Sequence, residues 1–473
     1  MKSLTMRRHC LPALLSLPLT LVLLGCGGGG GAAADSHAGG NAGGSGGLPL
    51  GPAPTAPEVV VQLRSGAAID TLAAAYGLQV LDQFGRRPIW RLGLPMRADV
   101  DAVVDTLVRD GRVLAAEPNV QSEVPENRRN GAWTIGGDAG TYAAQWAPQA
   151  LRLPQAHALS EGAGVRVAVL DTGVDLDHPA LAARLQRDGA GNVLGRDFVD
   201  DDAVAAEAGS RADPGWGHGT HVAGLVALAA PQARLMPVRV LDPAGQGNAW
   251  VLAEALLWAV DPDGNVATDD GAHVVNLSLG TTRPTNLLRK AIALASCDFD
   301  DDEDDEEDYR DPGFDDDRAR CAARRSAVVM AAAGNGGSDT ELLFPAAEGA
   351  QGALAVTAST EARRLASFAN RGPWVEVAAP GELIMSTVPG GGYGVWSGSS
   401  MAAPLAAGSA ALLLATPAPS GDPLLPTQRQ WLSTEVAKRV YDRTSQLCGG
   451  TWLRQIDAYA ALTDTSAPDP ACP

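Results

Sequence analysis

Positive charge is scarce in this sequence. Its 473 residues include 36 Lys and Arg against 55 Asp and Glu, which leaves a net charge of −19. Binding to nucleic acid needs a positive surface that displaces counterions from phosphate, so the composition argues against nucleic acid as a partner. The acidic excess is local, because residues 298–320 hold 14 acidic residues and 3 arginines and contribute −11 of the total. The rest of the chain is only mildly acidic.

Long hydrophobic runs are also missing. Hydrophobic residues make up 45% of the chain and charged residues 19%, which fits neither a membrane bundle nor a globally disordered protein. The apolar stretch Leu11–Leu24 is too short to cross a bilayer comfortably, and basic residues precede it, as in an export signal. We therefore expect residues 1–25 to be a signal peptide and the protein to be exported from a bacterial cell.

The end of this stretch, Leu23-Leu24-Gly25-Cys26, resembles the lipobox of bacterial lipoproteins, where signal cleavage leaves the cysteine as a lipidated N-terminus. The Gly-rich residues that follow are typical of a tether. We predict a lipid on Cys26 that anchors the chain to the membrane at the cell envelope. The alternative is a plain secretory signal with an incidental cysteine.

Cysteine is sparse as well, with six in the whole chain. Export would place the last four in an oxidising compartment, where they can form disulfides. Four cysteines allow three pairings. We predict the pairing of nearest neighbours, which joins Cys297 to Cys321 across the acidic segment and Cys448 to Cys472 in the C-terminal tail.

The first folded unit is predicted to begin at Glu58. Residues 26–57 are Gly, Ala, Ser and Pro with almost no large apolar residue, so they are predicted to be a linker. Short apolar runs then predict strand, helix, strand, strand, helix and strand at 59–61, 67–76, 78–84, 88–92, 100–108 and 112–116. This order is that of a small ferredoxin-like α+β domain over residues 58–124, although many unrelated small domains share it.

The longer region after residue 140 has the pattern of an α/β fold. Six short apolar runs without polar alternation, typical of strands buried on both faces, lie at 165–170, 234–240, 274–279, 327–333, 353–358 and 375–379. Helical patterns lie between them, so we expect a parallel sheet covered by helices on both faces. In such folds the active site lies at the carboxyl ends of the strands.

Two polar motifs stand at such positions. Asp171 ends the apolar run Val167–Leu170 and precedes a glycine turn, although an acid in an ordinary loop is the simpler reading of this motif alone. His218 lies between glycines at the start of a small-residue helix, where other backbone and substrate can approach closely. A zinc site is a poor alternative, because His218 and His221 are three residues apart and no glutamate lies between them. His221 is the better candidate for packing.

Two further motifs lie later in the chain. Ser400 precedes a small-residue helix, and Pro404 is expected in its first turn, so Ser400 would lie at a helix N-terminus that favours negative charge. The adjacent Ser399 leaves some ambiguity, which the spacing to Pro404 decides for Ser400. Asn335, between glycines after an apolar run, could donate its amide to an oxyanion, although Asn-Gly turns are common.

The order Asp, His, Asn, Ser, each at a strand end or helix start, resembles the subtilisin-like serine proteases over about residues 145–463. Residues 58–124 resemble the inhibitor-like prodomain of that family more loosely. The resemblance implies a serine endopeptidase with Asp171 as the orienting acid, His218 as the general base, Ser400 as the nucleophile and Asn335 as the oxyanion donor. Proteins or peptides would be the substrates.

The resemblance also implies that the chain is made as a precursor that processes itself. The prodomain would act as an intramolecular inhibitor. If the chain is then cut within a processing linker at 125–144, the cut would also release the catalytic domain from the lipid. Residues 464–473 are predicted to be a C-terminal tail. The stretch Asn276–Gly280 resembles the strand edge that binds extended substrates in this family, so Ser278 and Gly280 are expected to contact substrate main chain. Catalysis would require no metal or other cofactor.

Two segments depart from the common pattern of the family. The acidic insertion at 298–320 is interpreted as a solvated loop, with cation binding or repulsion of acidic substrates as alternatives. Oxygen ligands alternate along Asp261–Asn265, as in calcium loops, but no glutamate stands at the twelfth position and the glycine is misplaced. A structural calcium ion is therefore a weaker expectation.

Two other functions would each predict a feature that the sequence does not have. A catalytically silent surface or adhesion protein on the same scaffold would lack a member of the triad, and none is missing. An esterase of the α/β-hydrolase type would carry a Gly-x-Ser-x-Gly elbow and the chain order Ser, Asp, His. Ser400 lacks that setting and comes last, so the sequence favours a peptidase.

Overall fold

The computed structural model describes residues 56–128, 134–297, 319, 321, 326–349, 352–418, 432–469 and 472. The predicted signal peptide, the lipid site at Cys26, and nearly all of the linker and the acidic insertion lie outside these residues. Among the helices of the described ranges, none combines the length and the apolar character needed to cross a membrane.

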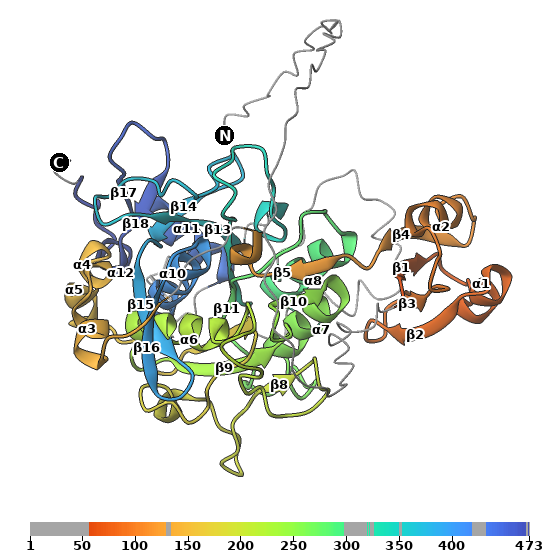
Figure 1. Cartoon of the computed structure of the whole chain (residues 1–473), viewed down its shortest axis with the longest axis horizontal. Coiled ribbons are helices and arrows are strands. Elements are labelled where there is room, and N and C mark those ends of the chain that lie inside the picture. The colour runs from red at the N-terminus through yellow and green to blue at the C-terminus, as the bar shows by residue number, and fades with distance from the viewer. Residues whose placement is uncertain are drawn as a thin grey trace, which may run out of the picture. The chain divides into compact units, whose positions relative to one another are not determined.

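The first domain along the chain is small, and its elements follow the order that the apolar runs predict (Figure 1). These elements are β1 (Glu58–Leu63), α1 (Ile69–Tyr76), β2 (Gln79–Gln83), β3 (Ile89–Gly93), α2 (Val100–Leu107) and β4 (Val113–Pro118). The sheet has the order β2-β3-β1-β4, and all its neighbours are antiparallel. Alternation along β1 explains its two faces: Val59 and Val61 pack with Leu72 and Leu107 of the helices, whereas Val60 joins a core of the large domain.

The large domain contains a nine-stranded sheet. Its order is β17 (Thr444–Gln446), β18 (Arg454–Ile456), β14 (Val377–Pro380), β13 (Ala353–Ser359), β12 (Val328–Ala332), β11 (Val274–Leu277), β7 (Arg166–Asp171), β9 (Arg234–Arg239) and β8 (Arg196–Asp197). Every neighbouring pair is parallel except β17 and β18. The six apolar runs are the six strands from β14 to β9, so the predicted parallel sheet is confirmed.

Helices cover both faces of this sheet (Figure 1). One core joins Val167 and Val169 of β7 to residues of α6 (His218–Ala229), α10 (Ser399–Leu414), α11 (Ser433–Asp442) and α12 (Ala458–Thr463). The other joins Ala168 and Leu170 to α7 (Ala249–Val260) and α8 (Asn286–Ser296). Because both faces of the strand are buried, β7 needs no polar alternation.

Shorter elements complete the large domain. They are β5 (Gln121–Glu123), β6 (Thr134–Ile135), α3 (Ala139–Ala144), α4 (Trp146–Ala150), α5 (Leu153–His157), β10 (Gln246–Asn248), β15 (Ile384–Val388) and β16 (Gly392–Trp396). Both predicted disulfides are present, Cys297–Cys321 and Cys448–Cys472. The first joins the two ends of the acidic insertion.

The small domain packs against the N-terminal ends of α7 and α8. The carboxylate of Glu117 accepts hydrogen bonds from the backbone N–H groups of Asn286 (2.7 Å) and Leu287 (2.9 Å), the first residues of α8. Asn119 accepts from the backbone N–H of Trp250 in α7 (3.0 Å). These contacts satisfy donors that a helix cannot pair within itself, so each helix gains a cap from the small domain.

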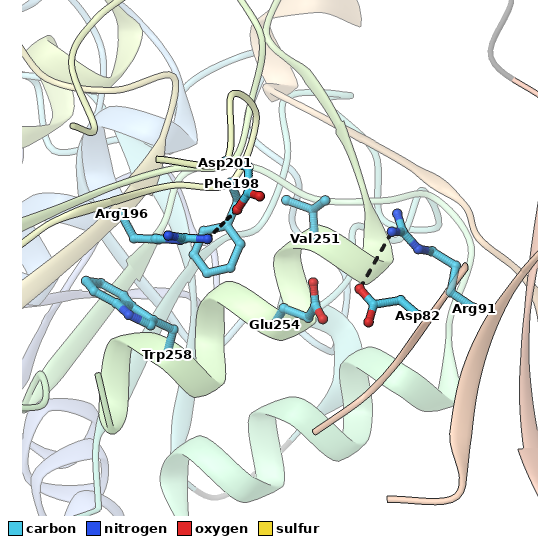
Figure 2. A pocket seen from close by; sticks show the side chains of 8 residues that line it. All are labelled: Asp82, Arg91, Arg196, Phe198, Asp201, Val251, Glu254 and Trp258. Atoms are coloured by element: carbon cyan, nitrogen blue, oxygen red, sulfur yellow. Dashed lines mark hydrogen bonds and ion pairs between the residues drawn. The ribbon is translucent and has the colours of Figure 1, made fainter. Parts of the chain in front are cut away.

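A pocket of about 630 Å³ opens beside this contact. It is lined by Asp82, Arg91, Arg196, Phe198, Asp201, Val251, Glu254 and Trp258. Figure 2 shows that the carboxylates of Glu254, on α7, and Asp82, on the small domain, face the same pocket. Burial raises the pKa of Glu254 to about 7, and the charge of Asp82 adds to this effect.

Candidate active site

The four residues singled out in the sequence lie at ends of neighbouring elements. Asp171 is the last residue of β7, His218 is the first of α6, Asn335 follows β12, and Ser400 is the second residue of α10. All four are buried. The strands β7, β11 and β12 are consecutive in the sheet, so their carboxyl ends bring these loops together.

Asp171 and His218 are in direct contact. Nδ1 of His218 lies 2.7 Å from Oδ1 of Asp171, and the same oxygen accepts the backbone N–H of Thr172. The two loops approach closely, because a Cβ on Gly219 would lie 2.1 Å from the carbonyl oxygen of Gly173. A glycine after His218 is therefore required by space, as the sequence predicts.

A second carboxylate, which the sequence analysis did not predict, lies in the site. Glu126 is buried, and its Oε2 accepts the hydroxyl hydrogen bond of Ser400 (2.9 Å) and lies 3.3 Å from Nε2 of His218. Its Oε1 accepts from Nδ2 of Asn335 (3.0 Å). Gly398 makes room for it, because a Cβ there would lie 1.8 Å from Oε1. One carboxylate therefore touches His218, Asn335 and Ser400 at once.

The two adjacent serines have different roles in the structure. Ser399 accepts the backbone N–H of Gly334 through its hydroxyl (3.1 Å), whereas the hydroxyl of Ser400 points to Glu126. The expected place of Pro404 in the first turn is wrong, because α10 begins at Ser399 and Pro404 lies inside it. Pro404 has no N–H to give to the carbonyl of Ser400, and that carbonyl accepts from the hydroxyl of Ser278 instead (2.9 Å).

Comparison with known proteins identifies the family of the chain. A family model described as "Subtilase family" matches residues 162–451, and one described as "Fervidolysin N-terminal prodomain" matches residues 55–119. The chain belongs to the subtilase family. It is therefore a serine endopeptidase with an N-terminal prodomain.

Individual relatives agree with this assignment. The thermophilic serine proteinase of Bacillus sp. (strain AK1) is 35% identical over 67% of this chain and 66% of its own length. Thermitase of Thermoactinomyces vulgaris is 35% identical over 57% of this chain and 81% of its own length. The crystal structure of fervidolysin from Fervidobacterium pennivorans, described as a keratinolytic enzyme related to subtilisin, shares the fold with a TM-score of 0.61 at 22% identity. It covers 88% of this chain and 62% of its own.

Charges around the buried imidazole of this subtilase set its protonation. Burial alone would lower the pKa of His218, but the charge and hydrogen bond of Asp171, together with those of Glu126, raise it to about 10. His218 is therefore an imidazolium held between two carboxylates at neutral pH. Burial and the charge of His218 lower the pKa of His221 to about 3, and this ring packs edge-on against Trp396, as the packing interpretation predicts.

The segment after the prodomain lies between two strand edges of the catalytic domain. β5 pairs antiparallel with β10, and on its other side Glu123 and Gly280 exchange both backbone hydrogen bonds (2.9 and 3.0 Å). The backbone N–H of Val124 donates to the carbonyl of Gly245 (3.1 Å). Gly280 thus contacts the main chain of an extended segment, whereas Ser278 contacts Ser400.

The main chain turns before it reaches the nucleophile. The backbone N–H of Asn127 donates to the carbonyl of Val124 (3.1 Å), within the 3₁₀ turn Pro125–Arg128. The side chain of Glu126 enters the site from this turn. In the full-length chain the carboxylate of Glu126 therefore lies next to the hydroxyl of Ser400.

The candidate calcium loop forms a cluster that differs from the predicted one. The carboxylates of Asp261, Asp263 and Asp270 come within 4.8 Å of one another, whereas Asn265 bonds to the backbone of Ala267. Burial raises the pKa of Asp270, and the charges of Asp263 and Asp261 add to this. Three carboxylates are hard oxygen ligands of the type that calcium binds, but calcium takes six to eight. The cluster fits such an ion only in part.

Two functional candidates escaped the sequence analysis. Glu126 lies in the stretch that was predicted to be a processing linker, and no periodic pattern marks it. Glu207 lies in the loop between β8 and α6, and it contacts the residues next to Asp171 and His218. Only the path of the chain brings either glutamate to the site.

Proposed function

We propose that the chain hydrolyses peptide bonds through an acyl-enzyme intermediate, with Asp171, His218 and Ser400 as the catalytic triad. The single observation that carries the proposal is the carboxylate of Glu126, on which His218, Asn335 and Ser400 converge while Asp171 supports the imidazole from behind. This convergence is what acyl transfer requires, because nucleophile, base and oxyanion donor must reach one reacting carbonyl.

Each residue has a distinct task in this mechanism. The Ser400 hydroxyl attacks the carbonyl carbon, and Nε2 of His218 accepts its proton and later donates it to the leaving amine. Asp171 accepts the Nδ1–H of His218, which sets the tautomer and stabilises the imidazolium. The Asn335 amide and the backbone N–H of Ser400, at the second position of α10, donate to the oxyanion. Water then hydrolyses the acyl-enzyme.

Extended peptides are the proposed substrates. Gly280 and Gly245 would hydrogen-bond their main chain in the way that they bond to Glu123 and Val124. Ser278 would contribute from the same edge, next to Ser400. Catalysis draws on side chains and backbone N–H groups alone, and a calcium ion at the Asp261 cluster would be structural.

The prodomain is the proposed intramolecular inhibitor, and cleavage within 125–144 the proposed activation step. Glu126 supports inhibition, because its carboxylate contacts Ser400, where a scissile carbonyl would have to bind, and raises the pKa of His218. Self-cleavage therefore needs this carboxylate to leave the site first. We further propose that export and a lipid on Cys26 place the precursor at the cell envelope, so that activation also releases the catalytic domain.

A fluorophosphonate probe tests the catalytic proposal. The probe phosphorylates an activated serine hydroxyl, so the mature enzyme should incorporate one label per molecule, and mass spectrometry of its peptides should place that label on Ser400. A Ser399→Ala variant should still be labelled, because that hydroxyl is bound to Gly334. A label on Ser399, or equal labelling of Ser400→Ala, would falsify the assignment.

We expect the association of the prodomain with the catalytic domain to weaken as the pH rises through about 7. The pKa of Glu254 is raised in the precursor, so its contribution to stability is present below its ordinary pKa of about 4 and is lost as the pH passes 7. The melting temperature of a Ser400→Ala precursor should fall over this range, and Glu254→Gln should make the fall smaller. Asp82→Asn should have the same effect, and the double variant should gain little more. Independent, additive effects would contradict a shared carboxylate pair.

A further inference from the structure

Glu207 is a half-buried residue whose carboxylate the proposed mechanism does not use. Its Oε1 accepts from the Thr172 hydroxyl (2.9 Å) and the backbone N–H of Gly217 (3.0 Å). Its Oε2 accepts from the hydroxyl (2.8 Å) and the backbone N–H (3.3 Å) of Thr220. Each oxygen therefore accepts two hydrogen bonds, and the four donors lie in the turn after β7 or at the N-terminal end of α6.

The donors are close in sequence to Asp171 and His218, the acid and the base of the proposed triad. Thr172 follows Asp171, whereas Gly217 and Thr220 lie on either side of His218. Thr172 strengthens the link, because its hydroxyl also accepts the backbone N–H of Gly219 (3.0 Å). Glu207 thus ties the loop that carries the acid to the helix that carries the base.

The N-terminus of α6 depends on this carboxylate. Its N-cap residue is Gly217, which has no side chain to cap the helix. The unpaired N–H groups of the first turn find acceptors elsewhere: His218 donates to Gly215, Gly219 to Thr172 and Thr220 to Glu207. A carboxylate at this end is also favoured by the helix dipole.

Desolvation makes this arrangement costly to maintain. Burial raises the pKa of Glu207 to about 7 and the charge of Asp171 adds to the rise, while the hydrogen bonds from Gly217 and from the hydroxyls of Thr220 and Thr172 oppose it. Perturbed carboxylates that bridge catalytic loops are more typical of functional sites than of ordinary packing.

We propose that Glu207 is a positioning residue that fixes the backbone on both sides of the contact between Asp171 and His218. The inference rests on the proposed function, because it concerns the geometry of that triad. Misplacement of a catalytic group by about 1 Å can cost a factor on the order of 100 in rate. The effect should appear in kcat, because the hydrogen bonds of this carboxylate within the described part of the chain go to Thr172, Gly217 and Thr220 and not to the substrate-binding edges.

Glu207→Gln tests the proposal. The amide keeps the shape of the side chain, but its NH₂ group meets a backbone N–H where an oxygen accepted one before. We expect kcat of the mature enzyme to fall by a factor of about 10 to 100 with KM changed less than about twofold. The low-field proton resonance of the Asp171–His218 hydrogen bond should also shift or broaden.

Glu376→Gln is the matched control. Glu376 is also half-buried, and burial raises the pKa of its carboxyl to about 7. It accepts the backbone N–H of Ala355 (2.7 Å) in β13, and the strands β12 and β11 separate β13 from β7. It should leave kcat and the proton resonance unchanged. If Glu207→Gln behaves like Glu376→Gln, the positioning role is refuted.

Two further variants keep the test decisive if Glu207→Gln does not fold. Thr172→Val and Thr220→Val each remove one hydroxyl donor and leave the carboxylate in place, and each should lower kcat without changing KM. Unchanged kcat in both would overturn the proposal. Fluorophosphonate titration of the wild-type enzyme distinguishes failure of the proposed function from failure of the positioning role. If Ser400 is not labelled, the proposed function is refuted. If Ser400 is labelled normally but kcat is unchanged in the Glu207 variants, only the positioning role is refuted.

Discussion

Replacing Ser400 with alanine is expected to lower kcat for peptide hydrolysis by a factor on the order of 10⁶, the size of effect known for the equivalent change in subtilisin, a relative in the same family. The hydroxyl is the group that forms the acyl bond in the proposed mechanism, and the neighbouring hydroxyl of Ser399 is bound to the backbone N–H of Gly334 and points elsewhere. The oxyanion donors remain, so a small rate above that of water should persist. Steady-state kinetics on a chromogenic peptide measures both.

The same variant tests maturation. If the chain cleaves itself, Ser400→Ala should stay full-length and remain with the membrane fraction on an immunoblot of fractionated cells, while the wild-type chain appears as a shorter, released form. Ser399→Ala serves as the control, because it removes a neighbouring hydroxyl that does not contact Glu126. Normal processing of Ser400→Ala in purified form would show that another mechanism cuts the precursor.

Local patterns were enough to predict much of the fold. The strands from β14 to β9 are apolar on both faces, and that pattern is visible in sequence because burial on both sides excludes polar alternation. Asp171, His218, Asn335 and Ser400 could be singled out for a related reason. Each stands where an apolar run ends or a small-residue helix begins, and parallel strands bring such points to one edge.

Other residues could not be predicted, because their positions depend on chain paths without a periodic pattern. Glu126 reaches the site only because β5 is held between β10 and Gly280 and the chain then turns. Asp270 joins Asp261 and Asp263 in the acidic cluster for the same kind of reason. Pro404 was misplaced by a few residues, since helix starts are poorly defined by sequence, and its actual place explains why Ser278 bonds to the carbonyl of Ser400.

Removing the carboxylate of Glu126 is expected to activate the full-length precursor. The group pairs with a buried imidazolium and accepts hydrogen bonds from Ser400 and Asn335. Loss of one partner from a buried ion pair costs about 3 to 5 kcal/mol, so Glu126→Ala should speed fluorophosphonate labelling of the uncut chain by a factor of about 10² to 10⁴. Labelling of freshly synthesised precursor, sampled before it is cut, gives this rate.

The pH dependence of the labelling rate tests whether the charge of Glu126 is what slows labelling of the precursor. In the wild-type precursor the pKa of His218 is raised to about 10, so labelling should stay slow at neutral pH and rise as the pH passes upward through that value and the imidazolium loses its proton. Without the charge of Glu126 this rise should move to lower pH, and the isosteric Glu126→Gln should show the same displacement. Glu123→Gln is the matched control, because the bonds of Glu123 to Gly280 are made by backbone. If Glu126→Ala is labelled as slowly as the wild-type precursor while mature enzyme is labelled fast, the main chain of the prodomain segment, and not this carboxylate, blocks the nucleophile.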